Sequence, residues 1–174
     1  MVRVEVATGD ITVETTDAIV NAANSSLLGG GGVDGAIHKA AGPALMEACR
    51  RLRSQVLPDG LATGQAVATP GYALAARWVI HTVGPMYWAS AAPERELAAC
   101  HISSLAVADE LGANSVAFPA ISAGAYGYPL VEAASIALRT VKQAETRVEW
   151  VRFILFNPDA YAAFARAAEE FAGR

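Results

Sequence analysis

The hydrophobic positions along the chain form short apolar runs that alternate with longer stretches of helical period. Residues 2–6 alternate between apolar and polar, and residues 18–22 form the continuous apolar run that is typical of a strand buried on both faces. Further strands are expected over residues 65–69, 78–83, 115–118 and 151–156, and helices over residues 35–52, 93–111, 129–143 and 158–171. This alternation predicts an α/β fold, a three-layer α/β/α sandwich with a largely parallel or mixed central sheet.

Composition and charge fit one globular domain that spans residues 1–174 and is long enough to bury a full hydrophobic core. The chain is 53% hydrophobic with a formal net charge of -4, so neither nucleic acid nor an anionic membrane is expected as its main partner. The sequence shows no leader-like segment and no apolar run of transmembrane length, so we expect a cytoplasmic protein. Cys49 and Cys100 lack the spacing of a metal site or a disulfide framework, so free thiols and no metal or cofactor are expected.

Two glycine-rich loops each follow an expected buried strand and lead into an expected helix. The first contains four consecutive glycines at residues 29–32, and the second reads SAGAYG at residues 122–127. Ligands of layered α/β proteins bind at the carboxyl ends of strands, where glycine allows close backbone approach and helix N-termini offer unpaired N–H groups. Either loop alone is compatible with a simple turn, but the two together favour a clamp around a pyrophosphate.

Neither loop is a typical nucleotide-binding motif in its usual place. GxxxxGK[ST] is absent, which disfavours P-loop NTPases. The spacing GxGxxG occurs only where the run of four glycines meets the next helix, in the second strand–loop–helix unit rather than the first, which disfavours Rossmann dehydrogenases. Ser25 and Ser26 lack the GxSxG elbow, and no Ser-His-Asp or Cys-His order stands out. A catalytic site in this chain is therefore expected to use water and a carboxylate, without a covalent intermediate.

Three polar residues near these loops each allow two interpretations. Asp10, after the first strand, is suited to accept a hydrogen bond from an exocyclic amine such as that of adenine, or to cap a turn. Asn24 is suited to bond a sugar hydroxyl, or to start the loop with an Asx turn. Asp34 is placed either to cap the following helix or to orient a water beside the phosphate site.

Two aromatic residues and two histidines also allow more than one interpretation. Tyr126 would cover a sugar face or lie at the rim with a wet hydroxyl, and Phe156 would stack on a base or pack in the core. On periodicity alone the core position is favoured for Phe156. His38 and His81 are expected to be packed residues rather than catalysts.

Taken together, these motifs make the chain similar to a known family. The motifs are GDIT (residues 9–12), VNAAN (20–24), LLGGGGVDGAIHKAAGP (27–43), IHTVGP (80–85) and FPAISAGAYGYP (118–129). In this order they resemble the macro domain over nearly the whole chain, and most closely the MacroD-type branch that includes bacterial O-acetyl-ADP-ribose deacetylases. The resemblance implies an α/β/α sandwich with a central mixed sheet that binds ADP-ribose.

The resemblance also implies roles for individual residues. Asp10, with Ile11 beside it, would bond the adenine amino group, and Phe156 would pack on the adenine. Asn24 would bond the distal ribose and Asp34 would take part in hydrolysis, with Tyr126 beside the same ribose. The residues implied to hold the diphosphate are Gly31, Gly32, Val33, Ser122, Ala123, Gly124, Ala125 and Tyr126.

The implied activity is removal of ADP-ribose from aspartate and glutamate esters on proteins and deacetylation of O-acetyl-ADP-ribose by water attack. Either Asp34 or the substrate's own phosphate would position the water. ADP-ribosylated ends would be the exception to the expected absence of nucleic-acid partners. Two alternatives remain: a non-catalytic reader of ADP-ribose, and a phosphatase acting on ADP-ribose 1″-phosphate. The presence of both Asn24 and Asp34 favours the enzyme.

Overall fold

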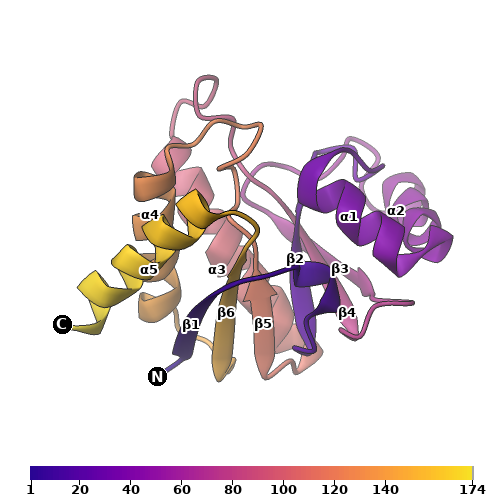
Figure 1. Cartoon of the computed structure of the whole chain (residues 1–174). Helices are drawn as coiled ribbons and strands as arrows, with labels where there is room; N and C mark the ends of the chain where they lie inside the picture. The colour runs from indigo at the N-terminus through magenta and orange to yellow at the C-terminus, as the bar shows by residue number, and fades with distance from the viewer. Residues whose placement is uncertain (174) are drawn as a thin grey trace.

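The computed structural model describes residues 1–173 as one sheet with helices on both sides (Figure 1). The strands are β1 (Arg3–Thr8), β2 (Ala18–Ala23), β3 (Ala66–Pro70), β4 (Trp78–Val83), β5 (Ser115–Phe118) and β6 (Trp150–Leu155). The helices are η1 (Ile11–Val13), α1 (Gly32–Ala41), α2 (Pro43–Gln55), α3 (Pro93–Leu111), α4 (Leu130–Gln143) and α5 (Pro158–Ala172). None of the helices within residues 1–173 is long and apolar enough to cross a membrane.

The sheet is mixed, with strand order β1-β6-β5-β2-β4-β3. All neighbouring pairs are parallel except β3 and β4, which are antiparallel. The five strands other than β3 therefore share one direction, and their carboxyl ends lie at one edge of the sheet. This edge is at the top of Figure 1, where the loops that lead to α1 and α4 are also found.

Two hydrophobic cores, one on each face of the sheet, confirm the three-layer α/β/α arrangement. One core lies under α3, α4 and α5 and includes Leu105, Leu138 and Phe164. The other lies under α1 and α2 and includes Ile37 and Leu45. Alternate residues of the buried strand β2 enter opposite cores, as a strand covered on both faces requires.

One expected helix is divided in the structure. Residues 35–52 were expected to form a single helix, but α1 ends at Ala41 and α2 begins at Pro43. Gly42 between them has φ +86°, a conformation that side chains rarely adopt, and Pro43 has no N–H to continue the first helix. The apolar period runs on through this break, so the hydrophobic pattern alone did not reveal it.

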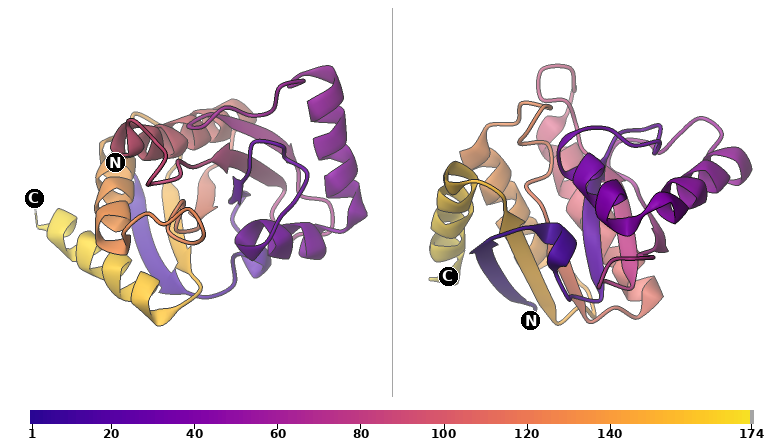
Figure 2. Two further views of the ribbon diagram at one scale, coloured as in Figure 1. Left: turned by 90° about the horizontal axis from the view of Figure 1, so that it is seen from above. Right: turned by 45° about the vertical axis from the view of Figure 1, so that its right-hand side comes forward.

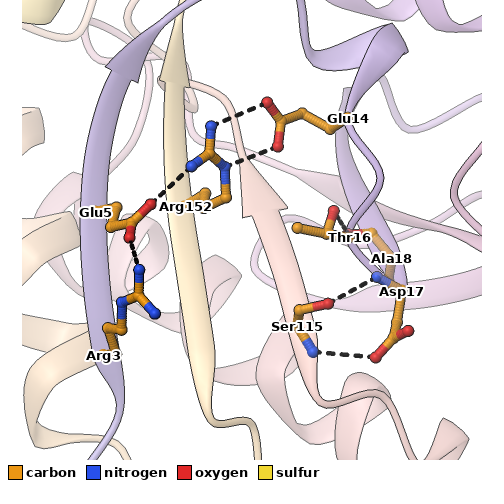
Figure 3. A network of polar contacts seen from close by, with 8 residues as sticks. All are labelled: Arg3, Glu5, Glu14, Thr16, Asp17, Ala18, Ser115 and Arg152. Carbon is orange, nitrogen blue, oxygen red and sulfur yellow. Dashed lines mark hydrogen bonds and ion pairs between the residues drawn. The ribbon is translucent and has the colours of Figure 1, made fainter.

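A polar network ties the segment before β2 to the centre of the sheet (Figure 3). Arg152 on β6 donates to Glu5 on β1 at 2.7 Å and to Glu14, which follows η1, at 2.8 Å. The backbone N–H of Asp17 donates to the hydroxyl of Ser115 at 2.8 Å, and the Asp17 carboxylate accepts from the backbone N–H of Ser115. These bonds fix the path of the chain from β1 through η1 to β2. They thereby fix the position of the segment that follows the carboxyl end of β1.

Replacement of Arg152 tests this network. We expect Arg152→Met to lower the free energy of unfolding by about 1–3 kcal/mol, because the largely covered Glu14 loses its charged partner and Glu5 keeps only Arg3. The matched control is Arg139→Met, which breaks the more exposed pair with Glu94 and is expected to cost less than about 1 kcal/mol. Urea denaturation measures both values, and equal losses would contradict the assignment of a structural role to Arg152.

Candidate functional site

The carboxyl ends of the parallel strands bring the candidate residues to one edge of the sheet in a defined order. Asp10 follows β1, Phe156 follows β6, the loop of residues 119–129 follows β5, and the loop of residues 24–31 follows β2. We call these loops the second and the first glycine loop. The left-hand view of Figure 2 looks down on this edge. Residues far apart in the sequence thus line one surface, as the position of ligand sites in α/β sheets predicts.

The first glycine loop lies directly against the helix that follows it. A Cβ atom added to Gly35 would lie 2.6 Å from the carbonyl oxygen of Gly30, so the two backbones approach more closely than any side chain permits. Gly29 and Gly32 have φ +88° and +59°. In contrast, a Cβ atom at Gly31 would meet nothing within 4 Å, so open space lies beside this part of the loop.

Asp34 is buried in the first turn of α1, with 5% of its surface exposed. It is not the helix cap, because the N-cap residue is Gly31 and makes no side-chain bond. Its Oδ1 accepts a hydrogen bond from Nδ2 of Asn21 at 2.8 Å and lies 3.4 Å from Nε2 of His38. Its Oδ2 would lie 3.3 Å from a Cβ atom placed at Gly30, so this oxygen is directed at the first glycine loop.

Asn24 forms the Asx turn that was one of its two interpretations. Its Oδ1 accepts from the backbone N–H of Ser26 at 3.1 Å, and its Nδ2 donates to the carbonyl of Gly29 at 2.9 Å. The same Nδ2 would lie 3.3 Å from a Cβ atom at Gly30, the distance found for Oδ2 of Asp34. The structure therefore brings a polar atom of Asn24 and one of Asp34 equally close to the position that a side chain at Gly30 would occupy.

A buried polar network behind Asp34 was missed by the sequence reasoning. Nδ2 of Asn21 lies 3.1 Å from Nδ1 of His81, and Nε2 of His81 lies 3.0 Å from Oγ1 of Thr69. An amide nitrogen only donates, so Nδ1 of His81 is the acceptor and its proton is on Nε2. Burial lowers the pKa of His81 to about 3, and His38 adds to the effect. A signal for Asn21 was present, since it is a polar residue inside the apolar run of β2.

The second glycine loop presents exposed backbone above a buried hydroxyl. Ser122 is 6% exposed with φ +63°, whereas Gly124 and Ala125 are exposed. A Cβ atom at Gly84, just after β4, would lie 2.1 Å from Oγ of Ser122, so only glycine fits there. The neighbouring residues Ala123 and Tyr126 are partly buried. This loop and the first one stand at the ends of the adjacent strands β5 and β2.

Asp10 and Phe156 form the opposite end of the surface, at the ends of the paired strands β1 and β6. Asp10 caps η1 by accepting from the backbone N–H and the hydroxyl of Thr12 at 2.9 and 2.7 Å, and it remains exposed. Ile11 beside it is buried. Phe156 is 88% exposed, so the expectation of a core phenylalanine is wrong. It lies just past the last residue of β6, and its ring is free to meet a flat ligand.

Two cysteines and a surface groove lie outside the two glycine loops. Cys49 and Cys100 are free and buried, and burial raises the pKa of each thiol to about 11, so neither provides a thiolate at neutral pH. Within residues 1–173 no group of three His, Cys, Asp or Glu side chains is placed to hold a metal ion. A groove of about 850 Å³ runs between α3 and α4, and Arg95, Glu94 and Arg139 are its charged lining groups, of which Glu94 and Arg139 pair with each other at 2.9 Å.

Comparison with known proteins places these features in a family. A family model described as the macro domain matches residues 20–137. A macro domain-containing protein of Streptomyces coelicolor is 57% identical over 165 residues, which cover 95% of this chain and 98% of that protein. A Salmonella gallinarum protein named O-acetyl-ADP-ribose deacetylase is 49% identical over 168 residues, covering 94% of this chain and 93% of that protein.

Solved structures give the same result. A mutant Oceanobacillus iheyensis macrodomain with ADPR has a TM-score of 0.95 and 44% identity, and the match covers 98% of this chain and 94% of that one. The Trypanosoma brucei macrodomain in complex with ADP-ribose has a TM-score of 0.83 and 38% identity, covering 94% and 68%. In both, the likeness extends over nearly the whole chain described above.

The buried network makes the free energy of unfolding depend on pH. His81 has a folded pKa of about 3 against an ordinary value of 6.5, so in this range the unfolded chain binds a proton that the folded chain does not. The contribution of His81 to the free energy of unfolding is therefore fully present above pH 6.5 and is lost as the pH falls toward 3. We expect the free energy of unfolding of the wild type to fall by about 1.4 kcal/mol per pH unit more than that of His81→Gln between pH 6 and 4.

Urea denaturation at several pH values measures this difference. His101 is also buried, with its pKa lowered to about 4, and it supplies the control: His101→Gln should remove its own share and leave that of His81. Parallel pH profiles for the wild type and His81→Gln would contradict the account of a neutral, bonded His81.

Proposed function

This chain belongs to the macro domain family, and we propose that it is an ADP-ribosyl ester hydrolase built as a single macro domain over residues 1–174. It would remove ADP-ribose from aspartate and glutamate esters on proteins and deacetylate O-acetyl-ADP-ribose. Similarity to a protein named O-acetyl-ADP-ribose deacetylase supports the second activity. The observation that carries the proposal is the buried carboxylate of Asp34, whose Oδ2, like Nδ2 of Asn24, lies 3.3 Å from the Cβ position of Gly30, next to the open space at Gly31.

The order of the strand ends gives the proposed ligand its direction. Adenine would stack on the exposed ring of Phe156, and Asp10 would accept from its amino group with the carboxylate that caps η1. The diphosphate would lie between the glycine loops, against Gly31, Gly32 and Val33 on one side and residues 122–126 on the other. Backbone N–H groups at the start of α1 and of the second loop favour its negative charge. β1 and β2 are three strand spacings apart, roughly 14 Å, which a nucleoside diphosphate sugar spans in extended form.

The distal ribose would then lie by Asn24 and Tyr126, with its ester next to Asp34. Oδ1 of Asp34 is held by Asn21, which leaves Oδ2 on the side of Gly30 to accept a proton from water. The water oxygen attacks the ester carbonyl carbon, the bond to the ribose oxygen breaks, and the ribose oxygen takes the proton back from Asp34 and leaves as a hydroxyl. The products are ADP-ribose and a carboxylic acid. Positioning and one general base accelerate such a reaction on the order of a hundred- to ten-thousand-fold, and the modest barrier to ester hydrolysis requires no more.

Substitutions at two glycines test where the ligand lies. A Cβ atom at Gly31 or Gly124 would meet nothing within 4 Å, and neither residue has a positive φ. We therefore expect Gly31→Val and Gly124→Val to leave Tm almost unchanged but to weaken ADP-ribose binding at least tenfold, because the new side chains enter the space proposed for the diphosphate. Calorimetry measures the affinity. Gly35→Ala is the contrast, since its methyl group would meet the Gly30 carbonyl and should lower Tm as well.

Two substitutions at the proposed reaction centre test the chemistry. We expect Asp34→Asn to bind ADP-ribose nearly as the wild type does, and to release ADP-ribose from a glutamate-modified protein at least a hundredfold more slowly, since it keeps the shape and loses the base. Asn24→Ala should show a similar split with weaker binding. Asp159→Asn, which removes a carboxylate from the first turn of α5, is the control for general effects at helix starts.

Chromatographic assay of free ADP-ribose, with the affinity of each variant measured in parallel, separates the alternatives. A wild type that binds ADP-ribose but releases nothing from either ester would instead be a reader. Undiminished hydrolysis by Asp34→Asn would assign the activation of water to the phosphate of the substrate.

A further inference from the structure

Three large apolar side chains in a row are exposed beside the candidate site. They lie in the loop of residues 84–92, between β4 and α3, which we call the aromatic loop. Met86, Tyr87 and Trp88 are 44%, 43% and 68% exposed. No residue of this loop is charged. Isolated exposed apolar residues are ordinary, but a contiguous group of this size at the rim of a site is typical of a contact surface.

The aromatic loop is fixed to the second glycine loop. The backbone N–H of Tyr87 donates to the carbonyl of Tyr126 at 2.9 Å, and the rings of Tyr87 and Tyr128 are 4.9 Å apart. The ring of Trp88 covers Gly127, where an added Cβ atom would lie 2.4 Å from it. Both loops stand side by side at the top of Figure 1 and in the view from above in Figure 2. The exposed side chains are therefore presented in a set position at the edge of the site.

The bond from Tyr87 to the carbonyl of Tyr126 brings this loop next to a residue proposed to lie beside the distal ribose. From the adenine end, the strand ends run β1, β6, β5, β2 and then β4. Asp34 and Asn24 belong to the loop–helix unit after β2, and the aromatic loop follows β4, the next strand outward. An acyl group on a distal ribose that lies by Tyr126 would therefore leave the ADP-ribose close to the aromatic loop. An acetyl group ends at the ester, whereas a polypeptide continues past it.

We propose that Met86 and Trp88 form a docking surface for the polypeptide that carries the ADP-ribose, where they contact apolar or aromatic side chains flanking the modified acidic residue. This inference rests on the proposed function, because it takes the direction of the ligand from it. The absence of charge in the loop makes the contact one of apolar burial rather than ion pairing. The surface selects modified proteins with such neighbours over small esters of the same ADP-ribose.

The test compares two substrates in the whole protein. The first is a peptide mono-ADP-ribosylated on a glutamate flanked by leucine and phenylalanine, and the second is O-acetyl-ADP-ribose. For Met86→Ser and Trp88→Ser we expect kcat/KM for the peptide to fall roughly tenfold, as expected when one large apolar contact is lost, and kcat/KM for O-acetyl-ADP-ribose to stay within about twofold. Ile102→Ser is the matched control, since Ile102 is 55% exposed on α3 away from the site.

Each other outcome overturns the inference. An equal fall for both substrates would mean that the loop only supports the second glycine loop, and Met86, which does not cover Gly127, guards against confusing this with docking. Unchanged values for the peptide would exclude docking there. An equal fall for an ADP-ribosylated oligonucleotide would replace the polypeptide by stacked bases. If the wild type hydrolyses neither substrate, the proposed function fails. The docking surface is then tested by dissociation constants: Met86→Ser and Trp88→Ser should weaken binding of the modified peptide but not of O-acetyl-ADP-ribose, and equal effects on both would overturn it.

Discussion

The carbonyl oxygen of Gly30 lies where a methyl group on Gly35 would be only 2.6 Å away, and the arrangement of the site follows from this close approach. It holds the first glycine loop down on the start of α1. Nδ2 of Asn24 and Oδ2 of Asp34 each lie 3.3 Å from the position where a side chain at Gly30 would begin. The close approach also leaves Gly31 facing open space at the helix N-terminus, where an anion is favoured. The entropy lost in ordering four glycines is thus the cost of a surface that contains backbone where other proteins have side chains.

A buried carboxylate needs partners, and the fold supplies them from three strands. Asn21 on β2 donates to Asp34 and to His81 on β4, and His81 in turn is bonded to Thr69 on β3. Because burial keeps His81 neutral, its Nδ1 can accept from the amide that orients Asp34. The bond from Asn21 to His81 lasts only while His81 stays neutral. It therefore links the chemistry at the strand ends to packing inside the sheet.

Much of this architecture could be predicted from the sequence, because it depends on local signals. The apolar run of residues 18–22 gave the buried strand, and the glycine loops gave the position of the site at the strand ends. The break at Gly42 was missed because the apolar period continues across it, and backbone conformation at glycine leaves no trace in hydrophobicity. Periodicity alone favoured the core for Phe156 over a position that stacks on a base, yet the strand ends one residue earlier and the side chain is exposed. Asn21 and His81 could not be paired, because their contact joins strands whose adjacency is a property of the whole sheet.

The direction of the ligand across the strand ends is the central claim, since the roles of Phe156, Asp34 and the aromatic loop all depend on it. A crystal structure of the protein with ADP-ribose tests it most directly. The account predicts adenine on the ring of Phe156 with its amino group at Asp10, the diphosphate between the two glycine loops, and the distal ribose at Asn24 with its hydroxyls near Oδ2 of Asp34. A ligand bound in the reverse direction, or in the groove between α3 and α4, would contradict it.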